Sequence, residues 1–315
     1  MKPLRIGTRG SALALWQANH IKERLLQLHQ IESEIIRIRT SGDRFQSASI
    51  SQIGSETGTK GIFIKELEDA LLAGTVDLAV HSMKDVPTET PAGLAFSAIT
   101  KRADPRDCLI SGAGDSLHAL AEGARVGTSS LRRQAQLRHR RPDLNVMDLR
   151  GNVDTRLKKV AAGEFDAIVL AVAGVTRLGA SDRITEILPP EVMLPAVGQG
   201  ALGIETRADD PETSDLVEAL DDSGTRDCVT AERALLRELE GGCQVPLGAW
   251  ARPSQHGEIY LEACVFSPDG TEFVRRDLRG PAANAEEIGR RLGEILIEAG
   301  ADRILRLAGR SVGKG

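Results

Sequence analysis

Short apolar segments typical of β-strands alternate with segments typical of helices through residues 1–200 of this 315-residue chain. Parallel strands must be joined by a long crossover, usually a helix, so this alternation predicts an α/β fold with mainly parallel sheets. Strands are predicted at residues 4–8, 34–40, 76–80, 94–99, 109–111, 125–127, 145–149 and 167–171, and helices at 11–30, 63–73, 130–140 and 153–163.

Two of the predicted strand–helix units share one pattern. Leu4-Arg-Ile-Gly-Thr-Arg-Gly-Ser11 and Arg125-Val-Gly-Thr-Ser-Ser130 each pass from a strand through Gly-Thr and Ser into a helix. This likeness suggests two lobes of similar design. We expect the chain to pass between the lobes twice, in the polar segment 100–107 and in the Gly- and Pro-rich segment 189–203. Two such connections would form a hinge, with a cleft between the lobes.

The pattern changes after about residue 220. A helix at 229–239, a hairpin of strands 259–266 and 271–278, and an amphipathic helix at 284–299 predict a small α+β domain. We therefore expect domain 1 in residues 1–100 and 201–219, domain 2 in 101–200, and domain 3 in 220–315. Residues 52–61 are expected to form a mobile loop able to cover a cleft.

The composition argues against several classes of protein. No apolar run approaches the roughly 20 residues of a membrane span, and the N-terminal residues lack the apolar region of a signal peptide, so we expect a cytoplasmic protein without membrane partners. The four cysteines are widely spaced, which predicts neither a disulfide framework nor a metal site. Nothing suggests an extensive apolar interface, so a monomer is expected.

Positive charge is concentrated in the middle of an acidic chain. The formal net charge is -5, yet residues 125–159 hold eight Arg and two Lys against three Asp. Arginines at the ends of predicted strands suggest a ligand with several carboxylates or phosphates, because guanidinium groups bind such anions through two hydrogen bonds. A solvated helix face is the alternative, above all for residues 138–141. The candidate arginines are Arg9, Arg132, Arg133, Arg150, Arg156 and Arg177.

Serine residues stand at the starts of two predicted helices. Ser11 and Ser130 lie where unpaired backbone N–H groups and the helix dipole attract anions. Ordinary N-capping of the helices by these serines is the alternative.

Polar residues crowd the end of one predicted strand. The strand at 76–80 is followed by His81-Ser-Met-Lys-Asp-Val-Pro87. In α/β folds, ligands bind outside the carboxyl ends of the strands, and Asp85 beside Lys84 is a candidate acid, base or ion-pairing group there. A turn with solvated charges is the alternative.

One cysteine has unusual neighbours. Cys243 lies in Gly241-Gly-Cys-Gln-Val-Pro246, where the glycines leave its thiol accessible and suggest a covalent attachment point or a nucleophile. No histidine is near in sequence, so a hydrolytic Cys/His pair has little support. We expect Cys108, Cys228 and Cys264 to be small buried apolar residues.

Seven segments of the chain, taken in order, resemble the porphobilinogen deaminase (hydroxymethylbilane synthase) family. They are residues 5–17, 81–87, 104–107, 127–133, 149–157, 194–201 and 240–246. The resemblance implies two lobes like those of periplasmic binding proteins and a small third domain. It also implies one dipyrromethane cofactor per chain, joined by a thioether to Cys243.

The activity that the resemblance implies belongs to tetrapyrrole and haem biosynthesis. Such a transferase adds four porphobilinogen molecules in turn, loses ammonia each time, and releases hydroxymethylbilane with water. Asp85 matches the family's catalytic aspartate, and a fixed carboxylate suits both proton transfer and the positive charge that develops on a pyrrole nitrogen. Because porphobilinogen carries acetate and propionate groups, the predicted arginines suit a polycarboxylate.

The other site residues carried over from the family fall into two groups. The cofactor-binding group is Cys243, Ser82, Lys84, Asp85, Thr128, Ser129, Ser130, Arg132, Arg133, Arg150 and Gly151. The substrate-binding group is Arg9, Ser11, Gln17, Lys60, Phe63, Arg150, Arg156, Arg177 and Gln199. No metal is expected. Some relatives carry an additional lysine where we align Gln52, so that contact is not carried over.

Two functions other than this enzymatic one would use part of the same residues. A non-catalytic anion-binding clamshell would need the arginines but neither Asp85 nor Cys243. An RNA-binding module could use residues 131–141, but an aromatic content of 3% and the net acidity oppose a nucleic-acid partner.

Overall fold

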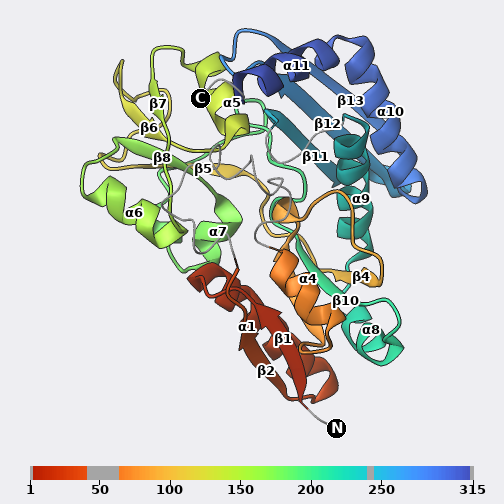
Figure 1. Cartoon of the computed structure of the whole chain (residues 1–315). Helices are drawn as coiled ribbons and strands as arrows, with labels where there is room; N and C mark the ends of the chain where they lie inside the picture. Colours follow the sequence, from red (N-terminus) through yellow and green to blue (C-terminus); the bar gives the residue numbers. More distant parts are fainter. Residues whose placement is uncertain (1–2, 41–63, 240–244, 313–315) are drawn as a thin grey trace. The chain divides into compact units, whose positions relative to one another are not determined.

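The computed structural model describes residues 3–40, 64–239 and 245–312, and the side chains of the last helix as far as Leu307 (Figure 1). The chain divides into two compact units. Unit 1 comprises residues 1–103 and 201–226, and unit 2 comprises residues 104–200 and 227–315. The finer division into three domains stays a prediction.

Unit 1 is built on a five-stranded sheet with the order β2-β1-β3-β10-β4. Four strands run in one direction, and β10 runs against both of its neighbours. The strands are β1 (Leu4–Thr8), β2 (Ser33–Arg37), β3 (Leu78–Ser82), β4 (Leu94–Ile99) and β10 (Leu202–Arg207). The helices are α1 (Ala12–His29), α4 (Lys65–Leu72), the short η1 (Met83–Asp85) and α8 (Pro211–Glu218).

Helices cover both faces of this sheet. On one face, Ile21 of α1 and Val217 of α8 pack on Ile204 of β10 in a single buried cluster. On the other face, Leu67 and Leu71 of α4 form a second cluster with the sheet. With both faces buried, the carboxyl edge of the sheet is left as the place where polar residues can gather.

The first part of unit 2 repeats this design. Its sheet has the order β7-β6-β8-β5-β9, again with four strands in one direction and one, β5, reversed. The prediction of an α/β fold with two similar, mainly parallel lobes is confirmed. The strands are β5 (Asp107–Ser111), β6 (Arg125–Gly127), β7 (Asn145–Met147), β8 (Ala167–Ala171) and β9 (Glu186–Ile187). The helices are α5 (Leu131–Arg140), α6 (Val153–Ala161), α7 (Val172–Arg177) and η2 (Ser181–Arg183).

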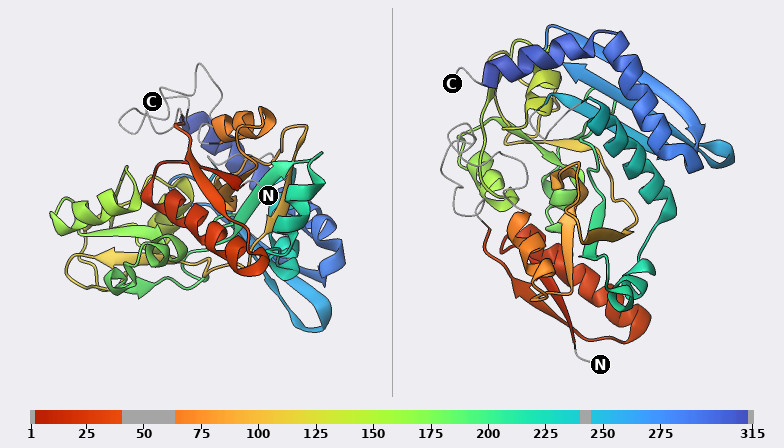
Figure 2. Two further views of the ribbon diagram at one scale, coloured as in Figure 1. Left: turned by 90° about the horizontal axis from the view of Figure 1, so that it is seen from below. Right: turned by 45° about the vertical axis from the view of Figure 1, so that its right-hand side comes forward.

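The rest of unit 2 is an antiparallel three-stranded sheet with helices on one face (Figure 2). Leu235 of α9 and Leu292 of α10 share a buried core with Leu261 of β12, as the α+β prediction required. The strands are β11 (Leu247–Pro253), β12 (Glu258–Phe266) and β13 (Phe273–Pro281). The helices are η3 (Gln255–Gly257), η4 (Ala282–Asn284), α10 (Ala285–Glu298), α11 (Ala301–Val312) and α9 (Ser223–Glu238), whose first residues, to Arg226, belong to unit 1.

One helix begins earlier than predicted, and several elements were not predicted. The helix α9 starts at Ser223 because Asp222 Oδ1 accepts a hydrogen bond of 2.8 Å from the Thr225 N–H, as a helix-capping residue does. The polar Ser-Gly-Thr sequence there resembles a loop, which hid the first turns. The sequence also gave no prediction for β9, β10, β11, α7, α8 and α11.

Candidate functional site

The carboxylate of Asp85 stands exposed just beyond the carboxyl end of β3, in η1. It makes no hydrogen bond or ion pair with any residue that the structure describes. It lines a cavity of about 70 Å³ together with Arg9, Ser11, Gln17 and Ser82, which are all predicted site residues. The structure therefore brings these five side chains together, and Lys84 is the half-buried neighbour of Asp85 in η1.

Local packing positions this segment. Met83, two residues before Asp85, is buried, and its backbone N–H donates to Ala201 O over 3.1 Å. A Cβ at Gly203 of β10 would lie 2.8 Å from two ring carbons of Phe96 and closer still to the Met83 sulfur. Only glycine at position 203 leaves room for the Met83 side chain under η1.

Two further contacts order the cavity. Gln17 Nε2 donates to Ser82 Oγ over 2.8 Å, which ties α1 to the end of β3. Ser11 Oγ accepts from the Ala14 N–H over 3.3 Å, so the capping interpretation is confirmed for Ser11. It is wrong for Ser130: that residue occupies the N-cap position of α5, but its side chain makes no capping hydrogen bond.

In unit 2, the predicted hydroxyl residues follow β6. Thr128 is buried, and its Oγ1 accepts from the Ser130 N–H over 3.3 Å. Ser129 Oγ donates to Leu149 O over 2.9 Å and accepts from the Leu149 N–H over 3.0 Å. These bonds join the turn after β6 to the segment after β7, which brings Ser129 close to Arg150.

Two of the predicted arginines are buried against an aspartate that the sequence analysis did not select. Arg132 Nη1 lies 2.6 Å from Asp107 Oδ2, and Arg133 Nη2 lies 2.7 Å from Asp107 Oδ1. Gln199 Nε2 also donates to Asp107 Oδ1, over 2.9 Å. Burial raises the pKa of Asp107, but the two guanidinium charges and their hydrogen bonds outweigh it and hold that pKa well below its ordinary value.

Both arginines are thus held rigidly in the interior, with different amounts of hydrogen-bonding capacity left. All three nitrogens of Arg133 donate to Asp107 or to Val169 O. Toward the residues that the structure describes, the Arg132 guanidinium donates through Nη1, and its buried Nε has no partner among them. A signal for this cluster existed in the sequence, because Asp107 is an acid directly before the apolar residues Cys-Leu-Ile of β5.

The three remaining arginines are half-buried. Arg156 Nε donates to Gly151 O over 2.7 Å, and Gly151 has a φ of +107° that favours glycine. Arg177 Nη2 donates to Gly200 O over 2.8 Å, and burial lowers the pKa of this guanidinium to about 10. A buried cation of this kind is stabilised by a nearby anion. Arg150 directly follows the buried Leu149.

The basic run at the end of α5 serves packing. Arg138 Nη1 donates to Pro268 O over 2.7 Å, Arg140 Nη2 to Glu191 O over 2.9 Å, and Arg141 Nη1 to Leu117 O over 2.7 Å. The first of these bonds ties the helix that carries Arg132 and Arg133 to the turn between β12 and β13, and the other two tie the run to the segments around Glu191 and Leu117. The RNA-binding alternative relied on this run and loses its main support.

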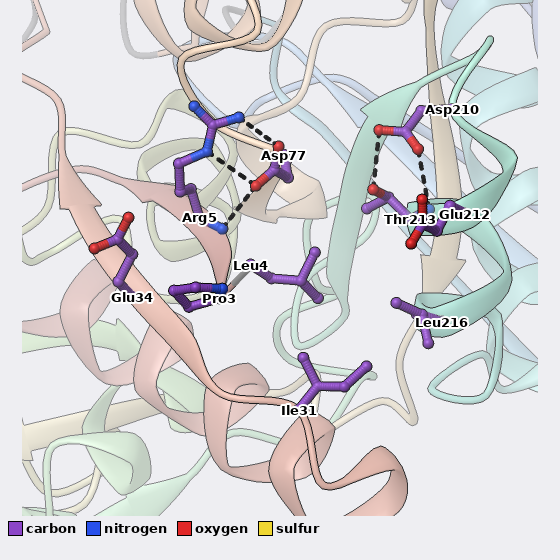
Figure 3. Close-up of a pocket in the computed structure, with 10 residues that line it drawn as sticks. All are labelled: Pro3, Leu4, Arg5, Ile31, Glu34, Asp77, Asp210, Glu212, Thr213 and Leu216. Carbon is purple, nitrogen blue, oxygen red and sulfur yellow. Dashed lines mark hydrogen bonds and ion pairs between the residues drawn. The ribbon is translucent and has the colours of Figure 1, made fainter. Parts of the chain in front are cut away.

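A larger cavity, of about 720 Å³, lies at the opposite end of β1 and β3 from Asp85 (Figure 3). Two of its charged groups pair with each other, since Arg5 Nη2 lies 2.6 Å from Asp77 Oδ1, and Asp210 Oδ1 accepts a hydrogen bond of 3.1 Å from the Thr213 N–H. Despite its size, we do not take it as the candidate site, because it holds none of the predicted residues.

Other predictions concern the cysteines and residues outside the described ranges. Cys108, Cys228 and Cys264 are buried, as predicted. Burial raises the pKa of the Cys108 and Cys264 thiols to about 12. Lys60, Phe63 and Cys243 lie outside the described residues.

The described residues were also compared with the requirements of a membrane-spanning helix and of a metal site. Within residues 3–40, 64–239 and 245–312, no helix is long and apolar enough to cross a membrane. The same residues contain no group of three or more His, Cys, Asp or Glu side chains that could hold a metal ion.

Several solved structures are similar to this chain at low sequence identity. A double mutant of the VFT2 domain of BvgS from Bordetella pertussis is 16% identical, with 73% of this chain and 91% of that chain covered at a TM-score of 0.41. A periplasmic substrate-binding protein of an ABC transporter from Coxiella burnetii is 16% identical, with 69% and 91% covered at 0.41. The aliphatic sulphonate binding protein SsuA from Escherichia coli is 15% identical, with 76% and 71% covered at 0.39.

Family models are more specific. Residues 4–215 match the model described as porphobilinogen deaminase, dipyromethane cofactor binding domain, and residues 227–298 match that of the porphobilinogen deaminase C-terminal domain. The chain belongs to the porphobilinogen deaminase family. This confirms the resemblance and the dipyrromethane cofactor, and it makes the chain a transferase of tetrapyrrole biosynthesis.

Proposed function

We propose that this protein condenses four porphobilinogen molecules head to tail, with loss of ammonia at each step, and releases hydroxymethylbilane by hydrolysis. The observation that carries the proposal is Asp85. An exposed carboxylate without a partner among the described residues shares a cavity with Arg9 and three hydrogen-bonding side chains. A non-catalytic clamshell would have no use for this arrangement.

The role proposed for Asp85 is both electrostatic and acid–base. Its carboxylate lies just beyond the end of β3, where the buried Met83 holds the chain, so it can face the positive charge that develops on a pyrrole nitrogen without reorganising. The same group can accept a proton from the ring carbon that forms the new bond and can deliver one to the departing amine. Arg9 in the same cavity is placed to bind a carboxylate of the substrate.

The donor set of unit 2 fits a polycarboxylate cofactor. The buried Arg132 Nε has no partner in the described part of the chain, and the Ser130 hydroxyl at the start of α5 makes no capping bond. Each is a donor that an acidic side group could satisfy. Dipyrromethane, when joined to Cys243, supplies the covalent primer for chain growth.

We assign the remaining predicted residues to the binding of the cofactor and of the substrate. Asp107 fixes Arg132 and Arg133 so that their directions are set before the ligand arrives, which reduces the entropic cost of binding. The carboxylate groups of cofactor and substrate are proposed to bind Ser82, Lys84, Thr128, Ser129, Arg150, Gly151, Arg156, Arg177 and Gln199, with Ser11, Gln17, Lys60 and Phe63 completing the substrate site.

The proposal also includes the domain division expected from the sequence and a monomeric cytoplasmic enzyme that contributes to haem biosynthesis. Limited proteolysis tests the domain division, light scattering tests the monomeric state, and cell fractionation tests the cytoplasmic location.

The test is the intact mass of the purified native protein, followed by peptide mapping and a porphobilinogen assay. A mass excess of two linked pyrrole units on the peptide that contains Cys243, together with consumption of porphobilinogen, is expected. Asp85→Asn should keep the cofactor and lose roughly 10²–10⁴-fold in turnover. If neither an adduct nor substrate consumption is found, even after incubation with porphobilinogen, the anion-binding alternative becomes the better account.

A further inference from the structure

A buried histidine–glutamate contact lies behind the cavity of Asp85. His81 Nε2 is 2.9 Å from Glu205 Oε2, and the two side chains are 3% and 1% exposed. Among the described residues, neither oxygen of Glu205 has a hydrogen-bond partner of good geometry. The histidine also lines the cavity itself. Burial of two ionisable groups is costly unless they stabilise each other, so this contact needs a function.

The sheet register explains how the pair forms. Glu205 of β10 is paired with Ala79 of β3, and Gly203 is paired with His81. Alternate residues of a strand share a face, so His81 and Glu205 lie diagonally on one face, within reach of each other. Gly203 contributes no side chain between them, and the space above it is filled by Met83.

The surroundings restrain the imidazole from several sides. Its ring meets the Phe96 ring edge-on, with centroids 5.9 Å apart at 73°. Glu68 of α4 faces the same region: burial and the charge of Glu205 raise the Glu68 pKa, while the His81 charge opposes them. Asp85 and Arg9 are the charged groups on the cavity side. The histidine therefore has one tightly defined position, four residues before Asp85.

We propose that His81, held by Glu205, is a positioning residue for Asp85. The imidazole fixes the end of β3 and the turn of Met83 over Gly203, and through them the direction of the Asp85 carboxylate. This inference rests on the proposed function, because it assigns a role in the same reaction. A misplacement of about 1 Å at a reacting group can lower a rate roughly 100-fold, so a firm support for Asp85 has a large effect.

The test compares Glu205→Gln, His81→Gln and the double variant, each purified with its cofactor and checked by intact mass. Both single variants keep the side-chain size closely enough to fold. We expect kcat to fall at least roughly tenfold, with KM for porphobilinogen changed by less than about threefold. The double variant should lose no more than the worse single variant, since both changes break one contact.

Two controls separate positioning from stability. Ser97→Ala removes partly buried hydroxyl contacts with Thr206 (2.6 Å) and Ser214 (3.1 Å) in the same unit and should lower the melting temperature without lowering kcat. In His81→Ala, added imidazole should restore part of kcat, because the missing ring lines a cavity.

Each outcome decides one question. Unchanged kcat in Glu205→Gln and His81→Gln, or losses that multiply in the double variant, would overturn the positioning role while the wild type still consumes porphobilinogen. If the wild type itself consumes none, it is the proposed function that fails. A fall in kcat that simply follows melting temperature, with Ser97→Ala affected equally, would reduce the pair to a structural contact.

Discussion

Replacing Asp107 by asparagine removes a charge that compensates two buried guanidinium groups. The carboxylate is completely buried. Among the described residues, it accepts hydrogen bonds from Arg132, Arg133 and Gln199. An asparagine at this position must turn an NH₂ group toward one of these donors. Removing one partner of a buried ion pair typically costs about 3–5 kcal/mol, and we expect a loss of this size in the free energy of unfolding.

The corresponding change in melting temperature is large enough to measure easily. For a folding unit of 150–250 residues, about 1 kcal/mol shifts the melting temperature by about 2–4 °C, so Asp107→Asn should lower it by about 6–20 °C. The matched control is Asp104→Asn, three residues earlier. Asp104 pairs with Arg106 at 2.6 Å, but both side chains are substantially exposed, and the expected loss is below about 1 kcal/mol.

The pH dependence gives a second readout with a defined sign. The folded-state pKa of Asp107 is lowered, so its contribution is fully present above the unfolded-state value of about 4 and is lost as the pH falls below it. The stability difference between wild type and Asp107→Asn should be constant from about pH 6 to 8 and should shrink in acid. A loss below about 1 kcal/mol, or a difference that does not change in acid, would refute the assignment.

Three further predictions follow from the site. Gly203→Ala should destabilise the protein by about 1–3 kcal/mol and lower kcat, because the new methyl group displaces Met83. In the control Gly224→Ala, on α9, the new Cβ meets Asp222 Oδ1 at an ordinary contact distance of 3.7 Å, and the melting temperature should be unchanged or higher in thermal scans. Arg150→Leu should weaken substrate or cofactor binding by about 1.5–3 kcal/mol, and an unchanged elongation profile in single-turnover experiments would contradict this. Cys243→Ser should carry no covalent pigment by mass spectrometry, and a thioether found elsewhere would move the attachment point.

Local features of the site could be predicted from the sequence because they depend on neighbours along the chain. A polar strand end next to Asp85 and the capping of α1 by Ser11 each follow from a few consecutive residues, although β3 runs to Ser82 and not, as predicted, to Val80. The repeated strand, Gly-Thr, Ser and helix pattern likewise predicted two lobes of one design, which the matching strand orders confirm.

Some interpretations depended on partners that periodicity does not specify. The arginines of α5 were predicted to bind ligand, but only the fold shows that Asp107 holds them in the interior. Ser130 has the residue type of a helix cap, yet its side chain makes no capping bond. An apolar or polar pattern indicates which face is buried, not which distant group a side chain will meet.

The sequence by itself determined the α/β class, the polar strand end that carries Asp85 and the membership in a family with a dipyrromethane cofactor. The tertiary structure alone decided that β5 and β10 run against their neighbours, and that β10 brings Glu205 onto His81 and Gly203 under Met83. Hydrophobic alternation is the same for a strand in either direction. Strand direction and register are selected by packing between segments far apart in the chain, and that packing exists only in the folded protein.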